Sequence, residues 1–302
     1  MDNVKNVFSI KDFENLSGIK AHTIRIWEKR YSILEPLRSD TNIRYYDIKN
    51  LRKLLNIVLL HNYGYKISKI SKLNPEELNA KVLEIISEKS IKTHAIKSFK
   101  VAMMTYDHSL FSATYDHLLK NKTFKEVFYD VFIPLMEELG FLWQTDTISI
   151  AHEHFITFLI KQKLLSLTEK IQIKPPTKLD RIFVLFLPLN EIHELGLMYI
   201  NHELIDSGYH TLYLGESMPV ESLVELKTYF NKITFISYLT VKPTVEKIPD
   251  FISQIETKLL NDTDHNFILL GKMTAEINRN NLSEKIKIYN SIPELTLSIY
   301  NE

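Results

Sequence analysis

The segment from Glu191 to Gly196 combines residue types that can bind or activate a ligand. Its sequence is Glu-Ile-His-Glu-Leu-Gly, and it follows the apolar run from Ile182 to Leu189, which is typical of a buried strand. A loop at the end of such a strand presents the imidazole of His193, and the carboxylate of Glu191 can hold that ring in one tautomer and raise its basicity. Gly196 lets a bulky ligand approach the backbone. The pattern predicts a ligand-binding histidine, and a surface histidine at a helix start is the alternative.

Residues 171–302 contain the elements that must position this loop. After the linker 171–178, whose paired prolines stop a helix, apolar runs alternate with segments of helical spacing. Alternation of this kind predicts a doubly wound parallel sheet with helices on both faces, which is a Rossmann-like domain. Ligands of such sheets bind beyond the carboxyl ends of the strands, where Glu191 to Gly196 would lie. The expected strands are 181–187, 210–214, 233–239, 267–271 and 286–290. The expected helices are 193–207, 219–231 and 244–260, with a short helical stretch after strand 267–271.

Residues 76–170 have helical apolar spacing, interrupted by a few polar or glycine-containing segments. About four helices with short connections follow from this pattern, which is that of a four-helix bundle. In this region Trp143 is a candidate core residue or ligand contact, and Glu153 and His154 follow it after nine residues. His152 and His154 lie two residues apart, so on a helix they point about 200° apart and cannot share one metal ion.

The first 75 residues predict short helices around a hairpin. Ser9 is placed to cap a first helix, residues 21–31 form a second, and Asp47 caps a third that runs through Leu60. Between the last two helices, residues 37–46 can form a hairpin tipped by residues 39 to 42. The order helix, turn, helix and wing predicts a winged helix-turn-helix head.

Side chains of this head are candidates for contacts with duplex DNA. Those early on the second helix would reach base edges in a major groove, and guanidinium groups beside the wing would clamp phosphates. Tyrosine hydroxyls could add contacts, and Asn42 tolerates the positive φ that a wing turn needs. Trp27 and Ile24 are expected in the core. The candidate DNA-binding residues are His22, Thr23, Arg25, Tyr31, Arg38, Asn42, Arg44 and Tyr45.

Charge and composition set further limits. Residues 1–75 hold 14 Lys and Arg against 7 Asp and Glu, while the remaining residues hold 23 against 30. A basic head on an acidic body favours binding of nucleic acid by the head. Cysteine is absent, which excludes disulfides and thiolate sites. No apolar run is long enough to span a bilayer and the chain begins without a signal-peptide pattern, so a cytoplasmic protein without membrane association is expected.

Three motifs in this order resemble parts of one group of proteins. Residues 17–46 match the winged-helix head of the MerR family, and the spacing Trp143-x9-Glu153-His154 matches the helical domain that covers the upper cobalamin face in light-sensing regulators. The segment from Glu191 to Gly196 resembles the Asp/Glu-x-His-x-x-Gly signature of cobalamin-binding domains. The whole chain resembles a MerR-type repressor with a C-terminal cobalamin-binding domain, the CarH/LitR group of photoreceptors. The domains expected from this resemblance are 1–75, 76–170 and 171–302.

The resemblance implies roles for residues on the lower side of the cofactor. His193 would bind cobalt from below, and the displaced benzimidazole tail would pass into the sheet domain. Ser237 and Leu239 match the Ser-x-Leu element of that tail site. Gly271 matches the first glycine of a Gly-Gly pair, whereas Lys272 departs from the second and could either point to solvent or block the tail.

On the upper side, the resemblance implies three contacts. Trp143 would cover the upper axial group, Glu153 would hydrogen-bond an adenosyl ribose, and His154 would stand close to cobalt. After photolysis His154 could take the vacated upper position.

The function implied is that of a DNA-binding repressor, not an enzyme, gated by adenosylcobalamin and light. Light would break the cobalt–carbon bond, change the state of a homo-oligomer (dimer or tetramer) and release double-stranded operator DNA. One alternative is a regulator of the same fold that has lost cobalamin and answers to a protein partner. Another is a corrinoid methyl-carrier enzyme, which the basic head argues against.

Overall fold

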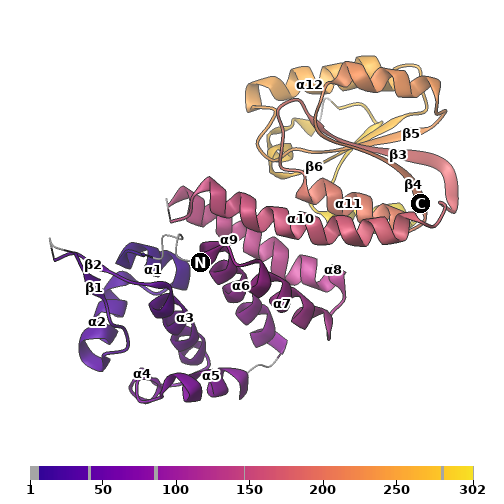
Figure 1. Ribbon diagram of the computed structural model, residues 1–302. Coiled ribbons are helices and arrows are strands. Elements are labelled where there is room, and N and C mark those ends of the chain that lie inside the picture. Colours follow the sequence, from indigo (N-terminus) through magenta and orange to yellow (C-terminus); the bar gives the residue numbers. More distant parts are fainter. Residues whose placement is uncertain (1–6, 40–41, 85–87, 146, 280–281, 302) are drawn as a thin grey trace. The chain divides into compact units, whose positions relative to one another are not determined.

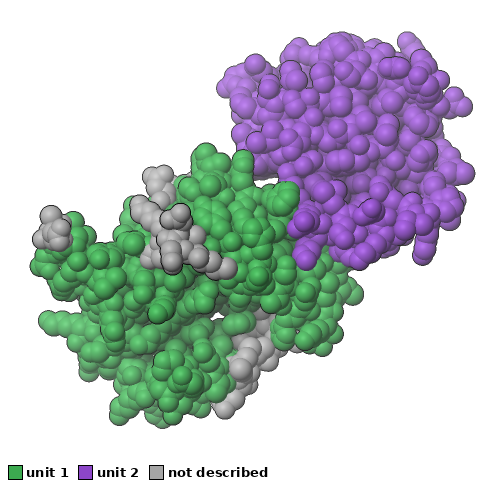
Figure 2. Space-filling view, in the orientation of Figure 1, with its two compact units in different colours: residues 1–160 green, residues 161–302 purple. Residues whose placement is uncertain are grey.

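The computed structural model describes residues 7–39, 42–84, 88–145, 147–279 and 282–301. The chain forms two compact units, residues 1–160 and residues 161–302 (Figure 2). The expected fold class is confirmed, because a winged helix-turn-helix head, a set of packed helices and a parallel sheet are all present (Figure 1). Within the described ranges no helix is long and apolar enough to cross a membrane.

The head begins with the capped helices that the sequence predicts. Ser9 and Asp12 form a capping box, in which each side chain accepts a hydrogen bond from the backbone N–H of the other residue. Asp47 caps the third helix by accepting from the backbone N–H of Asn50. Asp40 and Thr41, in the predicted hairpin tip, lie outside the described residues. Ile24 and Trp27 are buried, as expected. The elements of the head are α1 (Ile10–Ser17), α2 (Ala21–Tyr31), β1 (Leu37–Arg38), β2 (Arg44–Tyr45), α3 (Ile48–Asn62) and α4 (Ile67–Ile70). The next helix, α5 (Pro75–Glu84), falls almost wholly in the region 76–170 that the sequence assigned to the bundle.

The helices that follow pack around a core of phenylalanine rings. The ring centroids of Phe99 and Phe111 lie 4.9 Å apart, and those of Phe99 and Phe132 lie 5.6 Å apart. One of the helical runs contains a π-helical turn, η1 (Phe128–Phe132), without a break in the helix. The described part of this region therefore has four long helical runs. They are α6 (Glu88–Thr105), α7 (His108–Leu119), the run of α8 (Phe124–Val127), η1 and α9 (Ile133–Gln144), and α10 (Ile150–Gln172).

The second unit contains a five-stranded parallel sheet with the order β4-β3-β5-β6-β7. The next strand in the chain, β4, lies on one side of β3, and the strand after it, β5, lies on the other side. The strand order therefore reverses at β3, and the carboxyl end of β3 is the switch point of a doubly wound sheet. Figure 1 shows α11 (Leu195–Asp206) and α12 (Ile248–Ile255) on opposite faces of the sheet. The strands are β3 (Lys178–Pro188), β4 (Tyr209–Met218), β5 (Ile233–Tyr238), β6 (Asn266–Leu270) and β7 (Ile286–Ile288).

Two elements of this unit differ from the sequence-based expectation. The expected helix 219–231 is a 3-10 helix, η2 (Val220–Thr228), because its apolar side chains Val220, Leu223 and Leu226 recur every third residue. A final helix, α13 (Ile292–Asn301), was not predicted. It has local signals, since Ser291 Oγ accepts from Glu294 N–H and the side chain of Leu295 is buried.

Candidate functional site

Glu191 and His193 meet at the carboxyl end of β3. Glu191 is fully buried, and its Oε1 accepts hydrogen bonds from the backbone N–H of Ile192 at 2.9 Å and of His193 at 3.0 Å. The same oxygen lies 2.5 Å from His193 Nδ1. The His193 side chain is 44% exposed. A carboxylate beside Nδ1 is the usual orienting group of a histidine that binds a metal through Nε2, and the Glu191–His193 pair has this arrangement.

The second oxygen of Glu191 ties this loop to the next strand of the sheet. Oε2 accepts from the backbone N–H groups of Thr240 at 3.2 Å, Val241 at 2.7 Å and Lys242 at 2.7 Å, all of which follow β5. Burial by itself would raise the pKa of Glu191, but the hydrogen bonds from His193 and from these N–H groups lower it to about 2. Glu191 is therefore ionised at neutral pH and polarises the imidazole of His193.

A buried hydroxyl group lies at the end of β5. Ser237 Oγ is fully buried and has no hydrogen-bond partner among the residues that the structure describes. A buried polar atom without a partner is costly, which points to a ligand group that would supply one. This position agrees with a role of Ser237 in holding part of a cofactor.

Gly271 is required by the backbone itself. Its φ is 99°, and a Cβ at this position would lie 2.4 Å from the carbonyl oxygen of Leu239. Leu239 N–H in turn donates to Leu270 O at 2.8 Å. Only glycine fits against Leu239 here, so packing of the fold explains Gly271 whether or not a ligand binds. The side chain of Lys272 is exposed, which removes the possibility that it fills the interior.

Gly196 faces an aromatic ring. A Cβ at Gly196 would lie 3.0 Å from ring atoms of Tyr238, the middle residue of the Ser-x-Leu element. The glycine thus makes room for the Tyr238 ring. A ligand that approaches the backbone at Gly196 would have to displace that ring.

Apolar side chains are exposed in the two segments that Glu191 joins, after β3 and after β5. Leu189 is 55% exposed, Ile192 is 51% exposed and Val241 is 49% exposed. Exposed apolar groups gathered around a polar one are typical of a ligand-binding surface. Together with the Glu191–His193 pair and the buried Ser237 hydroxyl, this surface fits a large, partly apolar, metal-containing ligand such as cobalamin.

The candidate residues for the upper side of the cofactor belong to α9 and α10. Trp143 is 50% exposed near the end of α9, which is unusual for a core tryptophan. Glu153 is half-buried and His154 is exposed, both in the first two turns of α10. His152 is turned to other partners, because its Nδ1 lies 2.9 Å from Ser149 Oγ and its ring stacks on Tyr106. Within the described residues no group of three or more His, Asp or Glu is placed to hold a metal ion.

The candidate base-reading residues lie at the start of α2. His22 and Arg25 are exposed and Thr23 is half-buried, while Ile24 of the same turn is in the core. This amphipathic arrangement anchors the helix and leaves its polar side chains accessible, as a major-groove helix requires. Tyr31 and Tyr45 are half-buried.

The wing holds its arginines through side-chain contacts. Arg38 Nη1 donates to Asn42 Oδ1 at 2.5 Å, and Asn42 has a φ of 63°. Arg44 Nε donates to Glu28 Oε1 at 3.0 Å, and Glu28 Oε2 accepts from Tyr46 OH at 2.8 Å. Glu28 was not predicted as part of this interface. Because Arg38 and Arg44 remain exposed, these contacts pre-orient their guanidinium groups without burying them.

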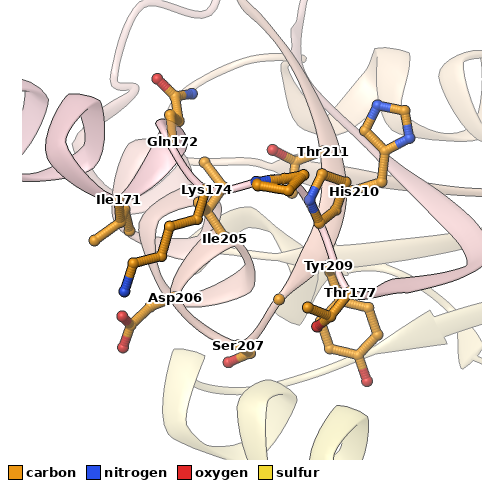
Figure 3. A pocket seen from close by; sticks show the side chains of 13 residues that line it. Ile171, Gln172, Lys174, Thr177, Ile205, Asp206, Ser207, Tyr209, His210 and Thr211 are labelled. Atoms are coloured by element: carbon orange, nitrogen blue, oxygen red, sulfur yellow. The ribbon is translucent and has the colours of Figure 1, made fainter.

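A pocket of about 380 Å³ lies at the other end of β3 and β4 (Figure 3). Its lining comes from the end of α10, the linker that follows and the turn between α11 and β4. It includes Thr177 and Tyr209, which stand at the starts of the two strands, whereas Glu191 follows the end of β3. The pocket is therefore separate from the candidate site.

Two family models match the chain. Residues 8–77 match the MerR HTH family of regulatory proteins, and residues 95–168 match the B12 binding domain. These matches cover the head and most of the region from α6 to α10. The chain thus joins a segment that resembles a MerR-type helix-turn-helix head to a segment that resembles a B12-binding domain.

The chain is similar to the HTH-type transcriptional repressor CarH of Myxococcus xanthus, with 28% identity over 72% of this chain and 74% of the relative. It is 23% identical to the repressor CarA of the same organism over 71% of this chain and 70% of the relative. The fold is similar to that of the monomethylamine corrinoid protein of Methanosarcina barkeri, with a TM-score of 0.56, 12% identity and coverage of 70% of this chain and 99% of that one. The matched segments point to a DNA-binding regulator with a B12-binding region, and the relatives CarH and CarA are transcriptional repressors.

Proposed function

We propose that the protein is a transcriptional repressor whose binding to operator DNA is controlled by adenosylcobalamin and light. The observation that supports this most is the buried Glu191 carboxylate that holds Nδ1 of the half-exposed His193. The relatives CarH and CarA are transcriptional repressors, which supports repression as the regulatory outcome.

On the sheet domain, His193 is proposed as the lower ligand of cobalt. Glu191 holds the imidazole in one tautomer and increases its electron donation. The Ser237 hydroxyl, the backbone at Leu239 and Gly271, and the space beside Gly196 are proposed to hold the cofactor's tail. The Tyr238 ring must then move away from Gly196, where it now packs.

On the helical domain, Trp143, Glu153 and His154 are proposed to contact the upper side of the cofactor. When bound, adenosylcobalamin would supply a cobalt–carbon bond that light breaks, with departure of the adenosyl group. The exposed Trp143 ring would exclude water from that group, and Glu153 would hydrogen-bond its ribose. His154 offers a second imidazole on the same side.

Light is expected to change the mass of the assembled protein. A single small head makes few phosphate contacts, so tight operator binding requires at least a dimer that reads spaced half-sites. The cofactor-loaded protein should be a homo-oligomer, dimer or tetramer, in the dark and should lose mass after green light. Light scattering before and after illumination measures this change directly.

Trp143→Ala tests whether contact of Trp143 with the upper side of the cofactor is needed for this change in mass, with Phe141→Ala as the matched control. Phe141 is a similarly exposed ring on the same helix. We expect the Trp143 variant to lose the difference between dark and light and the Phe141 variant to retain it. An unchanged mass after illumination of the loaded wild type would reject light-driven disassembly.

A second candidate function is a regulator that no longer binds cobalamin and answers to a protein partner. The Tyr238 ring packed against Gly196 is the observation that favours it. An absorption spectrum of the protein mixed with adenosylcobalamin in the dark separates the two candidates, since failure to load would favour this one.

Arg38→Ala and Arg44→Ala are each expected to weaken DNA binding and flatten its dependence on salt. One lost phosphate contact lowers the log–log salt slope on duplex DNA by about 0.9. A mobility-shift titration over a range of salt concentrations measures the slope. Lys174→Ala removes an exposed charge outside the head and should leave the slope unchanged. Identical slopes for both arginine variants and the wild type would place these side chains outside the DNA interface.

A further inference from the structure

Two acids lie close to His193 in the sequence, and their side chains have different partners. Glu191 holds the imidazole and the loop after β5, as described above. Glu194, the next residue after His193, has a separate set of partners: its Oε1 accepts from Lys161 Nζ at 2.9 Å and its Oε2 accepts from Tyr213 OH at 2.8 Å. Lys161 lies on α10 and Tyr213 on β4.

The Glu194 side chain is not used to stabilise its own helix. Glu194 occupies the N-cap position of α11, yet its carboxylate makes no capping hydrogen bond with that helix. An acid at this position ordinarily interacts with the free N–H groups of the first turn. Here the carboxylate is directed to α10 and β4 instead, so its contacts join different elements.

The ion pair is largely withdrawn from solvent. The side chains of Lys161 and Glu194 are 22% and 16% exposed. Lys161 Nζ also lies 3.7 Å from Glu216 Oε1, near the end of β4, and so stands between two carboxylates. Burial by itself would raise the pKa of Glu194, but the hydrogen bonds from Lys161 and Tyr213 lower it. Removal of Lys161 would leave the carboxylates of Glu194 and Glu216 without the ammonium group that both contact.

We propose that Lys161, Glu194 and Tyr213 form a positioning cluster that fixes the His193 loop to α10 and β4, so that a displacement of α10 is passed on to His193. This inference rests on the proposed role of His193 as the lower ligand. α10 is the helix that carries Glu153 and His154 in its first two turns. A movement of α10 caused by a ligand at Glu153 or His154 would therefore reach Glu194 through Lys161 and change the position of His193.

Lys161→Met and Tyr213→Phe test the cluster in the full-length protein. The first removes the charge, and the second removes only the hydroxyl and preserves the packing of the ring. Without cofactor, hydrogen–deuterium exchange of the backbone amides of 190–196 should become faster by about tenfold in both. With adenosylcobalamin in the dark, affinity should fall, but by less than the roughly ten- to a hundredfold that is common when a direct partner of a metal ligand is removed, because these side chains act through Glu194. The visible spectrum should shift toward that of His193→Ala.

Controls separate positioning from general stability. Lys161→Arg retains the charge and the donors and should restore slow exchange and the spectrum. Lys170→Met removes an exposed lysine of the same helix and should behave as the wild type. Exchange that rises equally over all of 161–302 would assign the cluster a merely structural part and overturn the proposal.

The same experiment distinguishes this proposal from the proposed function. If the wild type does not bind adenosylcobalamin but exchange at 190–196 still depends on Lys161, the cluster stands as an anchor of the loop and the proposed function fails. If the wild type binds adenosylcobalamin through His193 while Lys161→Met and Tyr213→Phe retain wild-type exchange and spectrum, the proposed positioning role of the cluster is wrong and the proposed function stands.

Discussion

His193→Ala should remove cobalt ligation from the sheet domain and weaken the binding of adenosylcobalamin on the order of a hundredfold. The reason is that the imidazole is the group that the buried Glu191 carboxylate holds at the end of β3. The His193 side chain is 44% exposed and lies outside the core, so the variant should remain folded. Its free energy of unfolding should change by less than about 1 kcal/mol. The visible spectrum and a binding titration in the dark measure the effect.

The control for this substitution is His210→Ala. His210 is an exposed histidine at the start of β4, at the opposite end of the sheet from His193. Its removal should leave spectrum and affinity as in the wild type. Unchanged spectrum and affinity in His193→Ala would show that His193 is not the ligand.

Glu191→Gln should destabilise the second unit by about 3 kcal/mol at neutral pH. The carboxylate accepts hydrogen bonds from the backbone N–H groups that follow β5. The amide NH2 of glutamine is itself a donor, so it would face these N–H groups without forming a hydrogen bond with them. Denaturant unfolding monitored by a probe in residues 161–302 measures the difference between the two proteins. Glu276→Gln, which removes an exposed acid of the same unit, should be close to neutral.

The sign of the pH dependence follows from the pKa of Glu191, which falls from its ordinary 4.5 to about 2 in the folded protein. A carboxylate with a lowered pKa contributes stability above its unfolded pKa, and that contribution is lost as the pH falls through the folded value. The difference corresponds to about 3 kcal/mol, at roughly 1.4 kcal/mol for each tenfold change in the protonation equilibrium. The wild type and Glu191→Gln should therefore converge in stability between about pH 4.5 and pH 2. A constant difference over this range would mean that the ionised carboxylate does not provide the stability.

The two predictions test linked properties of one loop. Glu191 joins His193 to the backbone that follows β5, and the proposed cluster at Glu194 joins the same loop to α10 and β4. A histidine held from both sides is preorganised, so less conformational entropy is lost when it binds a ligand. The proposed regulator would change state when one of these attachments moves.

The sequence by itself determined the features that depend on near neighbours in the chain. Ser9 and Asp47 are caps whose partners lie three residues away, and the structure has helices at both places. The apolar run from Ile182 to Leu189 predicted a buried strand, and the pairing of Glu191 with His193 spans only two residues. The two helices that the sequence analysis predicted wrongly or missed also depend on near neighbours. In η2 the apolar residues recur every third position, which was interpreted as α-helical spacing, and before α13 the cap at Ser291 was not recognised.

Only the tertiary structure decided which distant side chains meet. Glu191 bonds the backbone about fifty residues later because β5 lies beside β3, and Lys161 reaches Glu194 because α10 lies against the loop after β3. The exposure of Lys272 and the packing of Tyr238 against Gly196 likewise could not be derived from the pattern of residue types. Strand order and side-chain packing set these contacts, and neither leaves a periodic signal in the sequence. The sequence therefore predicted the histidine and its acid, whereas the fold decided what holds them in place.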